Sequence, residues 1–447
     1  MEVQASPARR FEELVAAGDH AAASQLLLRM HPVDAVDLLL NVTNGDQQRI
    51  LCNLSDESLA AFFEEMPEEA AARLARRLPV QRLVGVLREM FSDEATDLLQ
   101  TLPEEEIEAI LNAMGDEAVD LRQLLEYARE SSGGLMTTEF VAVRAQATAQ
   151  QALDYLRKKA PDAETAYYLY VVDDARRLVG ILSLRDLVIA PPDRKVEEMM
   201  NTGVIRVRVD DDQEHVARLF ERYGFLTLPV VDEEDRLVGI ITIDDAIQVL
   251  QDEATEDMYR MVGLVDGESV FSPFFESVRK RLPWLLINLV TAFLSASIVS
   301  LFEETIDRLV ILATFLPIVA GMGGNAGTQT LTIIVRSIAL GEVDFANAKE
   351  ALKKQILLGL VNGAVVGLVV GVVGYMWKGS ALLGVVLTVA LILNMAIGGL
   401  VGVAVPMGLK ALRVDPALAS GIFVTAFTDI LGFLFFLGLA TVVLAHF

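Results

Sequence analysis

Cysteine is the scarcest residue of this 447-residue chain, which contains only Cys52. A single thiol excludes an intramolecular disulfide framework and a thiolate metal cluster. Histidine is also scarce, and its four copies are scattered without the spacing that a zinc site requires. The histidines are His20, His31, His215 and His446.

Catalytic and export signals are missing as well. The chain has no HExxH pair, no P-loop and no nucleophile with a base at motif spacing, so we expect no enzyme. Met1 to Arg10 lacks the apolar core of a signal peptide. We therefore expect the N-terminal half of the chain to stay in the cytosol.

Basic residues are in short supply in the first 270 residues. From Phe271 onward, nine acidic residues stand against eleven basic ones, which leaves 53 acidic and 26 basic residues before it. An acidic soluble half with a net charge of −27 is thus joined to a near-neutral apolar half. Such an acidic surface argues against nucleic acid as a partner and favours cations.

Residues 1–130 predict an acidic α-helical superhelix. A Leu/Met-Pro-acidic mark recurs, as in Met66-Pro67-Glu68, and apolar residues between the marks repeat at helical spacing. Each unit is too short to bury its own apolar face, so neighbouring units are expected to stack. Asp93, Glu94 and Asp97 share one such helix and could bind a divalent ion, the alternative being a solvated acidic face.

The next segment repeats itself at an offset of 59 residues, so that Val171–Asp186 aligns with Val230–Asp245. Each copy contains a β-run, an acidic turn, a second β-run and a helix start with Ser or Thr at a capping position. This pattern resembles a tandem pair of cystathionine-β-synthase (CBS) domains, which are α/β modules that often sense adenine nucleotides. We place module 1 at residues 131–200 and module 2 at residues 201–246.

In CBS domains a Ser/Thr-x-x-Asp element can hold a ribose, while the helix N-terminus favours phosphate. The resemblance therefore implies ATP as a candidate modulator. The matching residues are Ser183 with Asp186 and Thr242 with Asp245 for the ribose, Arg185 for phosphate and Tyr168 for the adenine ring. The alternative is that Ser183 and Thr242 are ordinary N-caps.

An acidic connecting helix, predicted at residues 247–270, leads to a five-helix transmembrane pore domain at residues 271–447. Movement of the modules would pass along this helix, unless it is a passive linker. Arg279-Lys280-Arg281 should lie on the cytosolic side, which puts the C-terminus outside the cell (plasma or inner) membrane. The predicted spans are Pro283–Leu301, Leu309–Leu340 with a break inside, Ile356–Trp377, Ala381–Leu409 and Ala417–Ala445.

The second span contains a Gly-rich, amide-rich stretch, Gly321–Thr330. A break there would expose carbonyl oxygens, and Asn325, Thr328 and Gln329 would add neutral oxygen ligands of the kind that hard cations take. The alternative is close helix packing through Gly323 and Gly327, which have GxxxG spacing.

Asp429 is the single carboxylate of the last span. A charge at the centre of a membrane helix costs about 2.5–3.5 kcal/mol, so it persists where it faces protein or a wet cavity. Thr425 and Gly432 lie on the same helix face, which gives a small and polar stripe suited to a pore lining. The alternative is that Asp429 hydrogen-bonds to a neighbouring helix.

In their order along the chain, these motifs resemble those of the MgtE family of magnesium channels. The resemblance implies a homodimer with one pore on its axis, where two copies of Asp429 hold a hydrated Mg²⁺ ion with help from Thr425, Asn325 and Gly324. Mg²⁺ gives up its waters reluctantly, so such carboxylates would grip the hydration shell. The motifs are Gly133–Thr137, Glu253–Asp257, Gly323–Gly327, Asp415-Pro416-Ala417 and Asp429.

The resemblance also implies closure by intracellular Mg²⁺. Without Mg²⁺, like charges on the soluble half repel one another and favour an open arrangement. The matching ligand positions are Asp93, Asp97, Asp212, Glu214, Asp245, Glu253, Glu256, Asp257 and Asp415. Gly224, Gln248, Thr328 and Gly421 depart from acidic or amide residues of relatives, so these four are not carried over as ligands.

Two other functions are compatible with these features. An ion-coupled secondary transporter of divalent cations is indicated by the predicted break in the second span. Its flux would depend on a Na⁺ or H⁺ gradient, which a channel does not need. A membrane-anchored nucleotide sensor would use its spans only to dimerise and would conduct no ions.

Overall fold

The computed structural model of this chain describes residues 7–159, 163–264, 268, 270, 272–418 and 420–446. The chain divides into two compact units, Met1–Leu250 and Gln251–Phe447. The first unit contains a helical part and two small β-sheets, and the second contains the long apolar helices. This arrangement confirms the predicted fold class of a helical superhelix, a CBS pair and a five-helix transmembrane domain.

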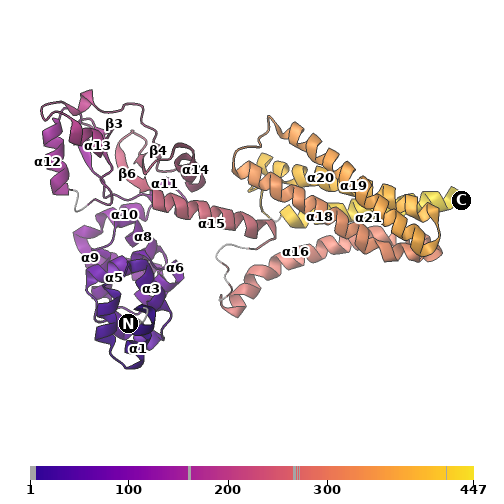
Figure 1. Cartoon of the computed structure of the whole chain (residues 1–447), viewed down its shortest axis with the longest axis horizontal. Helices are drawn as coiled ribbons and strands as arrows, with labels where there is room; N and C mark the ends of the chain where they lie inside the picture. Colours follow the sequence, from indigo (N-terminus) through magenta and orange to yellow (C-terminus); the bar gives the residue numbers. More distant parts are fainter. Residues whose placement is uncertain are drawn as a thin grey trace, which may run out of the picture. The chain divides into compact units, whose positions relative to one another are not determined.

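Short helices build the N-terminal part of the first unit (Figure 1). Their apolar faces share one core that extends from Phe11 to Leu121. Pro67, Pro79 and Pro103, the prolines of the repeated marks, are the N-cap residues of three of these helices. Proline lacks an N–H that the helix start could not use anyway, so it begins a helix without losing a hydrogen bond. The helices are α1 (Pro7–Ala16), α2 (His20–Leu27), α3 (Pro32–Leu40), α4 (Asn44–Leu51), α5 (Asp56–Glu64), α6 (Glu68–Ala75), α7 (Val80–Leu87), α8 (Ser92–Gln100), α9 (Glu104–Met114), η1 (Gly115–Ala118) and α10 (Val119–Leu124).

The following segment contains two three-stranded sheets of the same construction, ordered β1-β2-β3 and β4-β5-β6. In each sheet the first strand pairs parallel with the second, which pairs antiparallel with the third. The two hairpins begin 59 residues apart, at Tyr168 and Thr227, as the sequence repeat predicts. The elements are α11 (Ser132–Leu135), β1 (Ala142–Arg144), α12 (Ala149–Lys159), β2 (Tyr168–Val172), β3 (Leu178–Ser183), α13 (Leu184–Ile189), η3 (Val196–Glu198), β4 (Val207–Arg208), α14 (Gln213–Tyr223), β5 (Thr227–Val231) and β6 (Leu237–Thr242).

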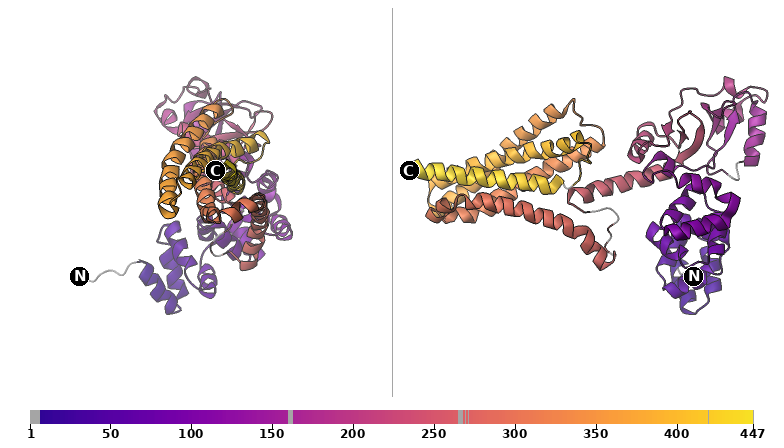
Figure 2. Two further views of the ribbon diagram at one scale, coloured as in Figure 1. Left: turned by 90° about the vertical axis from the view of Figure 1, so that its right-hand side faces the viewer. Right: turned by 180° about the vertical axis from the view of Figure 1, so that it is seen from behind.

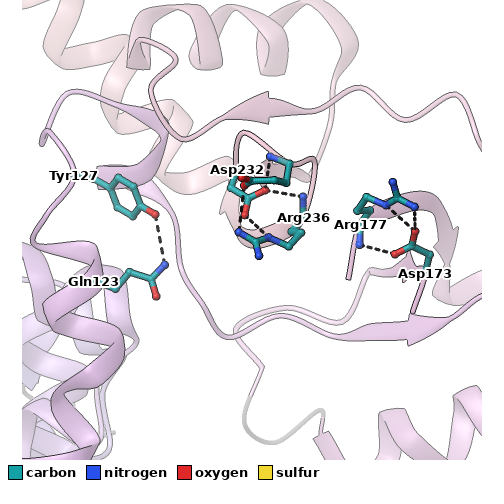
Figure 3. A network of polar contacts seen from close by, with 7 residues as sticks. Gln123, Tyr127, Asp173, Arg177, Asp232 and Arg236 are labelled. Carbon is teal, nitrogen blue, oxygen red and sulfur yellow. Dashed lines mark hydrogen bonds and ion pairs between the residues drawn. The ribbon is translucent and has the colours of Figure 1, made fainter. Parts of the chain in front are cut away.

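The acidic turn of each hairpin is closed by the same atoms (Figure 3). Asp173 Oδ1 accepts a hydrogen bond from the Arg177 backbone N–H at 2.9 Å, and Asp232 Oδ1 accepts one from the Arg236 backbone N–H at 2.8 Å. Each carboxylate also accepts a bond from the side chain of its arginine. Backbone hydrogen bonds between the two turns then join the modules as a pair.

The connecting helix, α15 (Ile243–Met261), begins four residues earlier than the predicted residue 247. It starts directly after β6, so the carboxylates of its first turn belong to the end of module 2 as well as to the helix. The predicted end at residue 270 lies beyond Met261, and residues 265–267 and 269 of the predicted helix lie outside the described residues.

Among the described residues of the second unit, five helices are long and apolar enough to cross a membrane, as the hydropathy pattern predicts. In both views of Figure 2, α18 to α21 lie side by side, and α20 contacts the other three. The helices are α16 (Phe274–Ser300), α18 (Ile311–Ala339), α19 (Ala348–Lys378), α20 (Ala381–Ala411) and α21 (Ser420–His446), with the short α17 (Glu303–Arg308) between the first two.

A seam of glycines holds α19 against α20. Gly359, Gly363, Gly367 and Gly371 recur at every fourth residue of α19, and all four are buried. A Cβ at Gly363 would lie 2.7 Å from Ile392 Cα, so no larger residue fits without separating the helices. Close backbone contact of this kind supplies the van der Waals packing that associates helices in a membrane.

The break predicted inside the second span is wrong, because α18 continues as a helix through Gly321–Thr330. Gly323 and Gly327 are buried in this helix. A Cβ at Gly323 would collide with the Asn394 side-chain amide of α20, and one at Gly327 would lie 2.5 Å from Val424 Cγ1 of α21. The glycines therefore serve the close packing of three helices, which is the GxxxG alternative.

Candidate cation sites

Three carboxylates from distant parts of the first unit converge on one place. Asp93 of α8, Glu164 before β2 and Asp245 of α15 hold carboxylate oxygens within 4.8 Å of one another. We call these three residues the acidic cluster. Asp93 and Asp245 are predicted ligand positions, whereas Glu164 was not predicted from the sequence. Among the described residues, this is the one group of three Asp, Glu, His or Cys side chains with such spacing.

Local chemistry fixes two members of the acidic cluster. Asp245 Oδ2 accepts hydrogen bonds from the Thr242 hydroxyl at 2.6 Å and from the Thr242 N–H at 3.3 Å, which ties the carboxylate to the end of β6. Asp93 is the second residue of α8, and Glu94 follows it. Carboxylates in a first helical turn are stabilised by the helix dipole, so both elements favour acids where they meet.

Burial and mutual repulsion oppose ionisation of these carboxyl groups. Desolvation raises the pKa of Asp93 well above its ordinary value, and the charges of Glu164 and Asp245 raise it further. Burial is also the largest cause that raises the pKa of Glu164 to about 7 and that of Asp245 to about 6. In the same region, burial raises the pKa of Glu94 to about 8 and that of Asp97 to about 6.

Two oxygens of the acidic cluster are orphaned. Asp93 Oδ1 and Glu164 Oε2 are buried and accept no hydrogen bond from any described residue. An unsatisfied buried acceptor costs about 1–3 kcal/mol, and more if it is charged. A bound cation would supply the missing partner and displace the protons. A donor set made only of carboxylate oxygens suits a hard divalent ion such as Mg²⁺.

A second group of predicted ligands is already paired with a cation of the chain itself. In the second unit, Arg260 Nη1 lies 2.6 Å from Asp415 Oδ2, and the same guanidinium pairs with Glu256 one turn earlier in α15. We call the carboxylates of Glu256 and Asp415, together with the Arg260 guanidinium between them, the arginine-bridged pair. Glu253 and Asp257 lie half-buried on the same helix. The guanidinium thus neutralises two carboxylates that the family resemblance implies as Mg²⁺ ligands.

Asp212 and Glu214 have local partners at the start of α14. Asp212 is the N-cap residue and accepts a bond from the Glu214 N–H at 2.9 Å, while Glu214 pairs with Arg218 at 3.4 Å. The helix ends at Gly224, whose φ of 65° is left-handed. Glycine adopts this conformation without strain. The backbone therefore gives a reason for the absence of an acid at position 224.

Asp429 lies half-buried in the middle of α21 and makes no hydrogen bond or ion pair with another described residue. The predicted alternative of a bond to a neighbouring helix thus has no partner in the part of the subunit that the structure describes. A Cβ at Gly324 would lie 3.7 Å from Thr425 Cγ2, so these two pore candidates are neighbours across α18 and α21. Asn325, beside Gly324, is exposed.

The nucleotide candidates occupy equivalent places in the two modules. Ser183 is the N-cap of α13, as the predicted alternative has it, and its hydroxyl donates to Asp186 Oδ2 at 2.7 Å. In module 2 the Thr242 hydroxyl donates the matching bond to Asp245 Oδ2 of α15. Tyr168 stands opposite Ser183 in the β2–β3 pair, and Arg185 is exposed one residue into α13.

Family models match most of the chain. A model described as MgtE, divalent cation transporter, matches residues 316–439, and the MgtE intracellular N domain matches residues 30–130. The CBS domain model matches residues 132–193 and 196–252.

Two solved structures are similar to more than half of the chain. The soluble part of a magnesium transporter is 35% identical with a TM-score of 0.52, covering 56% of this chain and 98% of that one. The cytosolic domain of the Mg²⁺ channel MgtE in complex with ATP is 40% identical with a TM-score of 0.52, covering 54% of this chain and 99% of that one.

The similarity to magnesium transporters extends over nearly the whole chain. Magnesium transporter MgtE of Thermus thermophilus is 37% identical over 441 residues, which are 97% of each chain. Magnesium transporter MgtE of Bacillus subtilis is 34% identical over 444 residues, 93% of this chain and 97% of the relative. With three family domains in this order and two relatives matched nearly end to end, this chain belongs to the MgtE family of magnesium transporters.

Proposed function

We propose that this chain forms a homodimeric, magnesium-selective channel that imports Mg²⁺ and is closed by Mg²⁺ bound to its acidic cytosolic domains. The acidic cluster carries this proposal, because its orphaned oxygens call for a cation in a unit whose described residues contain no helix long and apolar enough to cross a membrane. A cation held there is not in transit through the membrane. It therefore acts as a signal that reports its own cytosolic concentration.

Closure follows from the charge of the first unit. When Mg²⁺ is scarce, ionised carboxylates of the acidic cluster repel one another and favour separation of the elements that carry them. When Mg²⁺ is abundant, it binds the assembled cluster better than the separated residues. Mass action then shifts the population toward the assembled, closed form. The remaining predicted ligands, among them Asp97, Asp212 and Glu253, would add to this effect.

The pore is proposed to lie between two subunits, with both copies of Asp429 on the axis. Its half-buried carboxylate, without a partner among the described residues, is available to a hydrated ion. Thr425 and Gly324 are neighbours, and Asn325 is exposed nearby in the sequence, so hydroxyl, carbonyl and amide oxygens can extend the lining. Two negative charges favour hydrated divalent ions over monovalent ones.

The orientation of the chain follows the positive-inside rule. Residues 30–130 match a family domain described as the MgtE intracellular N domain, which supports a cytosolic location of the first unit. Arg279 and Lys280 near the start of α16, Lys353 and Lys354 near the start of α19, and Lys410 at the end of α20 would then lie on the same side. An odd number of spans leaves the C-terminus outside the cell membrane.

ATP is proposed as a modulator that binds module 1. The similar cytosolic domain in complex with ATP supports this assignment. Tyr168 and Ser183 stand opposite each other on β2 and β3, and Ser183, Asp186 and Arg185 form the start of α13. The hydroxyl of the N-cap keeps a lone pair for a sugar hydroxyl, and the helix N-terminus favours phosphate. Thr242 is the equivalent position of module 2.

The two other functions predicted from the sequence are less well supported. The secondary transporter was indicated by a broken second span, and α18 is unbroken. A sensor that does not conduct ions disagrees with the end-to-end similarity to magnesium transporters.

Purified full-length protein in inside-out patches tests the proposal, because the cytosolic Mg²⁺ concentration is then controlled directly. We expect Mg²⁺ current without a Na⁺ or H⁺ gradient, and closure as cytosolic Mg²⁺ rises. Asp429→Ala should reduce the current at least about tenfold, whereas Asp307→Asn, which removes an exposed carboxylate of α17, should not. Full current in Asp429→Ala would remove the pore assignment, and current insensitive to cytosolic Mg²⁺ would remove the closure.

A further inference from the structure

A three-residue segment before β1, Thr137–Glu139, contacts the start of α8, the backbone of Glu164 and β6, the strand that precedes Asp245. It bonds to the start of α8, which carries Asp93. It bonds to the backbone of Glu164 and to β6, which leads into Asp245. Three carboxylates distant in sequence thus share one neighbour. None of the sequence motifs singles out the last residue of this segment, Glu139.

The Glu139 carboxylate replaces a missing cap at the start of α8. The N-cap residue of this helix, Phe91, has no side chain that can accept a hydrogen bond. Glu139 Oε2 instead accepts from the Ser92 N–H at 3.3 Å and from the Ser92 hydroxyl at 2.7 Å. An anionic acceptor at a helix N-terminus satisfies an orphan N–H and complements the dipole. The residue that it holds, Ser92, directly precedes Asp93.

The rest of the segment holds the other two members. The Glu139 carbonyl accepts a bond from the Glu164 N–H at 3.1 Å. Thr137 exchanges backbone bonds of 2.8 Å and 3.0 Å with Ile240 of β6. The Thr137 hydroxyl also donates to Glu139 Oε2 at 2.6 Å, so the capping carboxylate is itself held in place. Glu139 therefore joins α8 to Glu164, and Thr137 joins the same segment to β6, which leads into Asp245.

We propose that Glu139 is a positioning residue that sets the spacing of the acidic cluster and thereby the cytosolic Mg²⁺ concentration at which the channel closes. This inference depends on the proposed function, because it assumes that the cluster binds Mg²⁺. Groups that orient metal ligands without touching the metal typically change affinity 10–100-fold when they are removed. The cap is supplied by a different segment from the helix it caps, so its loss removes both bonds of the Ser92 N–H and hydroxyl to Glu139 and leaves only the contacts of Ser92 with Thr138.

The test compares the half-closing Mg²⁺ concentration of the full-length protein in inside-out patches. For Glu139→Ala we expect an increase of about tenfold, because the ligands are no longer pre-arranged. Glu139→Gln keeps a neutral acceptor for Ser92, so a smaller increase, about threefold, is expected. The maximal current at low Mg²⁺ should stay unchanged, because Glu139 is not part of the membrane half.

A matched control separates positioning from general stability. Thr43→Ala removes the N-cap of α4, whose hydroxyl accepts a bond from the Asp46 N–H, and α4 carries no member of the acidic cluster. Both Thr43→Ala and Glu139→Ala should lower the melting temperature without Mg²⁺, but only the second should raise the half-closing concentration. Equal half-closing concentrations in Glu139→Ala and the native protein would overturn the inference.

Two further measurements keep failure of this inference distinct from failure of the proposed function. If the native channel does not close with Mg²⁺, the proposed function fails. If the native channel closes and Asp245→Asn weakens closure while Glu139→Ala does not, only the positioning role fails. Should Glu139→Ala not fold, Ser92→Ala removes the hydroxyl from the same contact, and an unchanged half-closing concentration in that variant would overturn the role equally.

Discussion

The acidic cluster and the arginine-bridged pair show two ways in which one chain keeps carboxylates close together. In the cluster, Asp93, Glu164 and Asp245 meet with two oxygens left unpartnered among the described residues. In the bridged pair, the Arg260 guanidinium stands between Glu256 and Asp415. The first arrangement needs a cation or protons from solution, whereas the second has a built-in cation. The carboxylates of the two groups therefore differ in whether they need a cation or protons from solution.

This difference teaches that acidic residues cannot be ranked as ion ligands by sequence alone. A carboxylate that already has a guanidinium gains little from Mg²⁺, because the ion must first displace the arginine. A buried carboxylate without a donor gains both neutralisation and a partner. The cluster is therefore expected to respond most strongly to Mg²⁺, and the bridged pair more weakly.

The largest effect is expected when the cluster loses two of its charges. In Asp93→Asn/Asp245→Asn, the half-closing Mg²⁺ concentration should rise about 100-fold, since each lost carboxylate weakens a hard-ion site about tenfold. Patch currents at controlled cytosolic Mg²⁺ measure this. The control Asp34→Asn/Asp37→Asn removes the same charge from exposed positions of α3. A shift of similar size in the control would mean that net charge, and not the cluster, sets closure.

A smaller effect is expected from pH, because the raised pKa values of Glu164, Asp245 and the neighbouring Glu94 place their titration between about pH 6 and 8. Without Mg²⁺, the folded form keeps protons that the unfolded form loses near the ordinary pKa values of 3.8 to 4.5. The stability that these extra protons give to the folded form is complete below the ordinary pKa values of 3.8 to 4.5. It is lost as the pH rises through 6 to 8. The melting temperature of Mg²⁺-free protein should therefore fall from pH 6 to pH 8.

Mg²⁺ should reverse this loss, because it binds the deprotonated cluster. Differential scanning calorimetry with and without Mg²⁺ should show a larger stabilisation at pH 8 than at pH 6, equivalent to about tenfold in affinity. Asp93→Asn/Asp245→Asn should flatten this pH dependence. An Mg²⁺-induced shift of equal size at both pH values would show that the cluster carboxyls do not titrate in this range.

The smallest effect is expected from removal of the built-in cation. Arg260→Gln leaves Glu256 and Asp415 without a counter-charge and should cost about 1 kcal/mol without Mg²⁺, since the pair is partly exposed. Added Mg²⁺ should recover most of this loss, which calorimetry measures. Arg308→Gln, which breaks the exposed Arg308–Glu304 pair of α17, is the control and should show no Mg²⁺-dependent recovery. An identical response of both variants would contradict the assigned difference.

Much of the architecture could be predicted because local sequence patterns indicate it. The 59-residue repeat predicts the two hairpins, and long apolar runs predict the five membrane helices. The break in α18 was predicted wrongly, since Gly323 and Gly327 have two compatible meanings in a membrane helix. Only the approach of Asn394 and Val424 from other helices decides between a break and tight packing.

The sites were predictable only in part, because they depend on contacts between distant residues. Asp93 and Asp245 stand in acidic helix starts that the sequence marks, but Glu164 and Glu139 stand in segments without a motif. Their roles arise from tertiary contacts between distant segments, which bring residues 47 positions apart, such as Ser92 and Glu139, together. The pairing of Arg260 with Asp415, 155 positions apart, could not be predicted from the sequence for the same reason.

The glycine seam of α19 has a consequence for how this membrane domain can evolve and move. At Gly359, Gly363 and Gly367 the backbone of α19 lies against the backbone of α20, and the Thr388 side chain within the seam is held by a hydrogen bond from its hydroxyl to the Gly367 carbonyl at 3.0 Å. We therefore expect the two helices to stay packed together, so that any rearrangement of the pore involves the neighbouring helices. Larger residues at the seam glycines should prevent the packing of α19 against α20, while apolar substitutions on the lipid-facing side of α19 should have little effect.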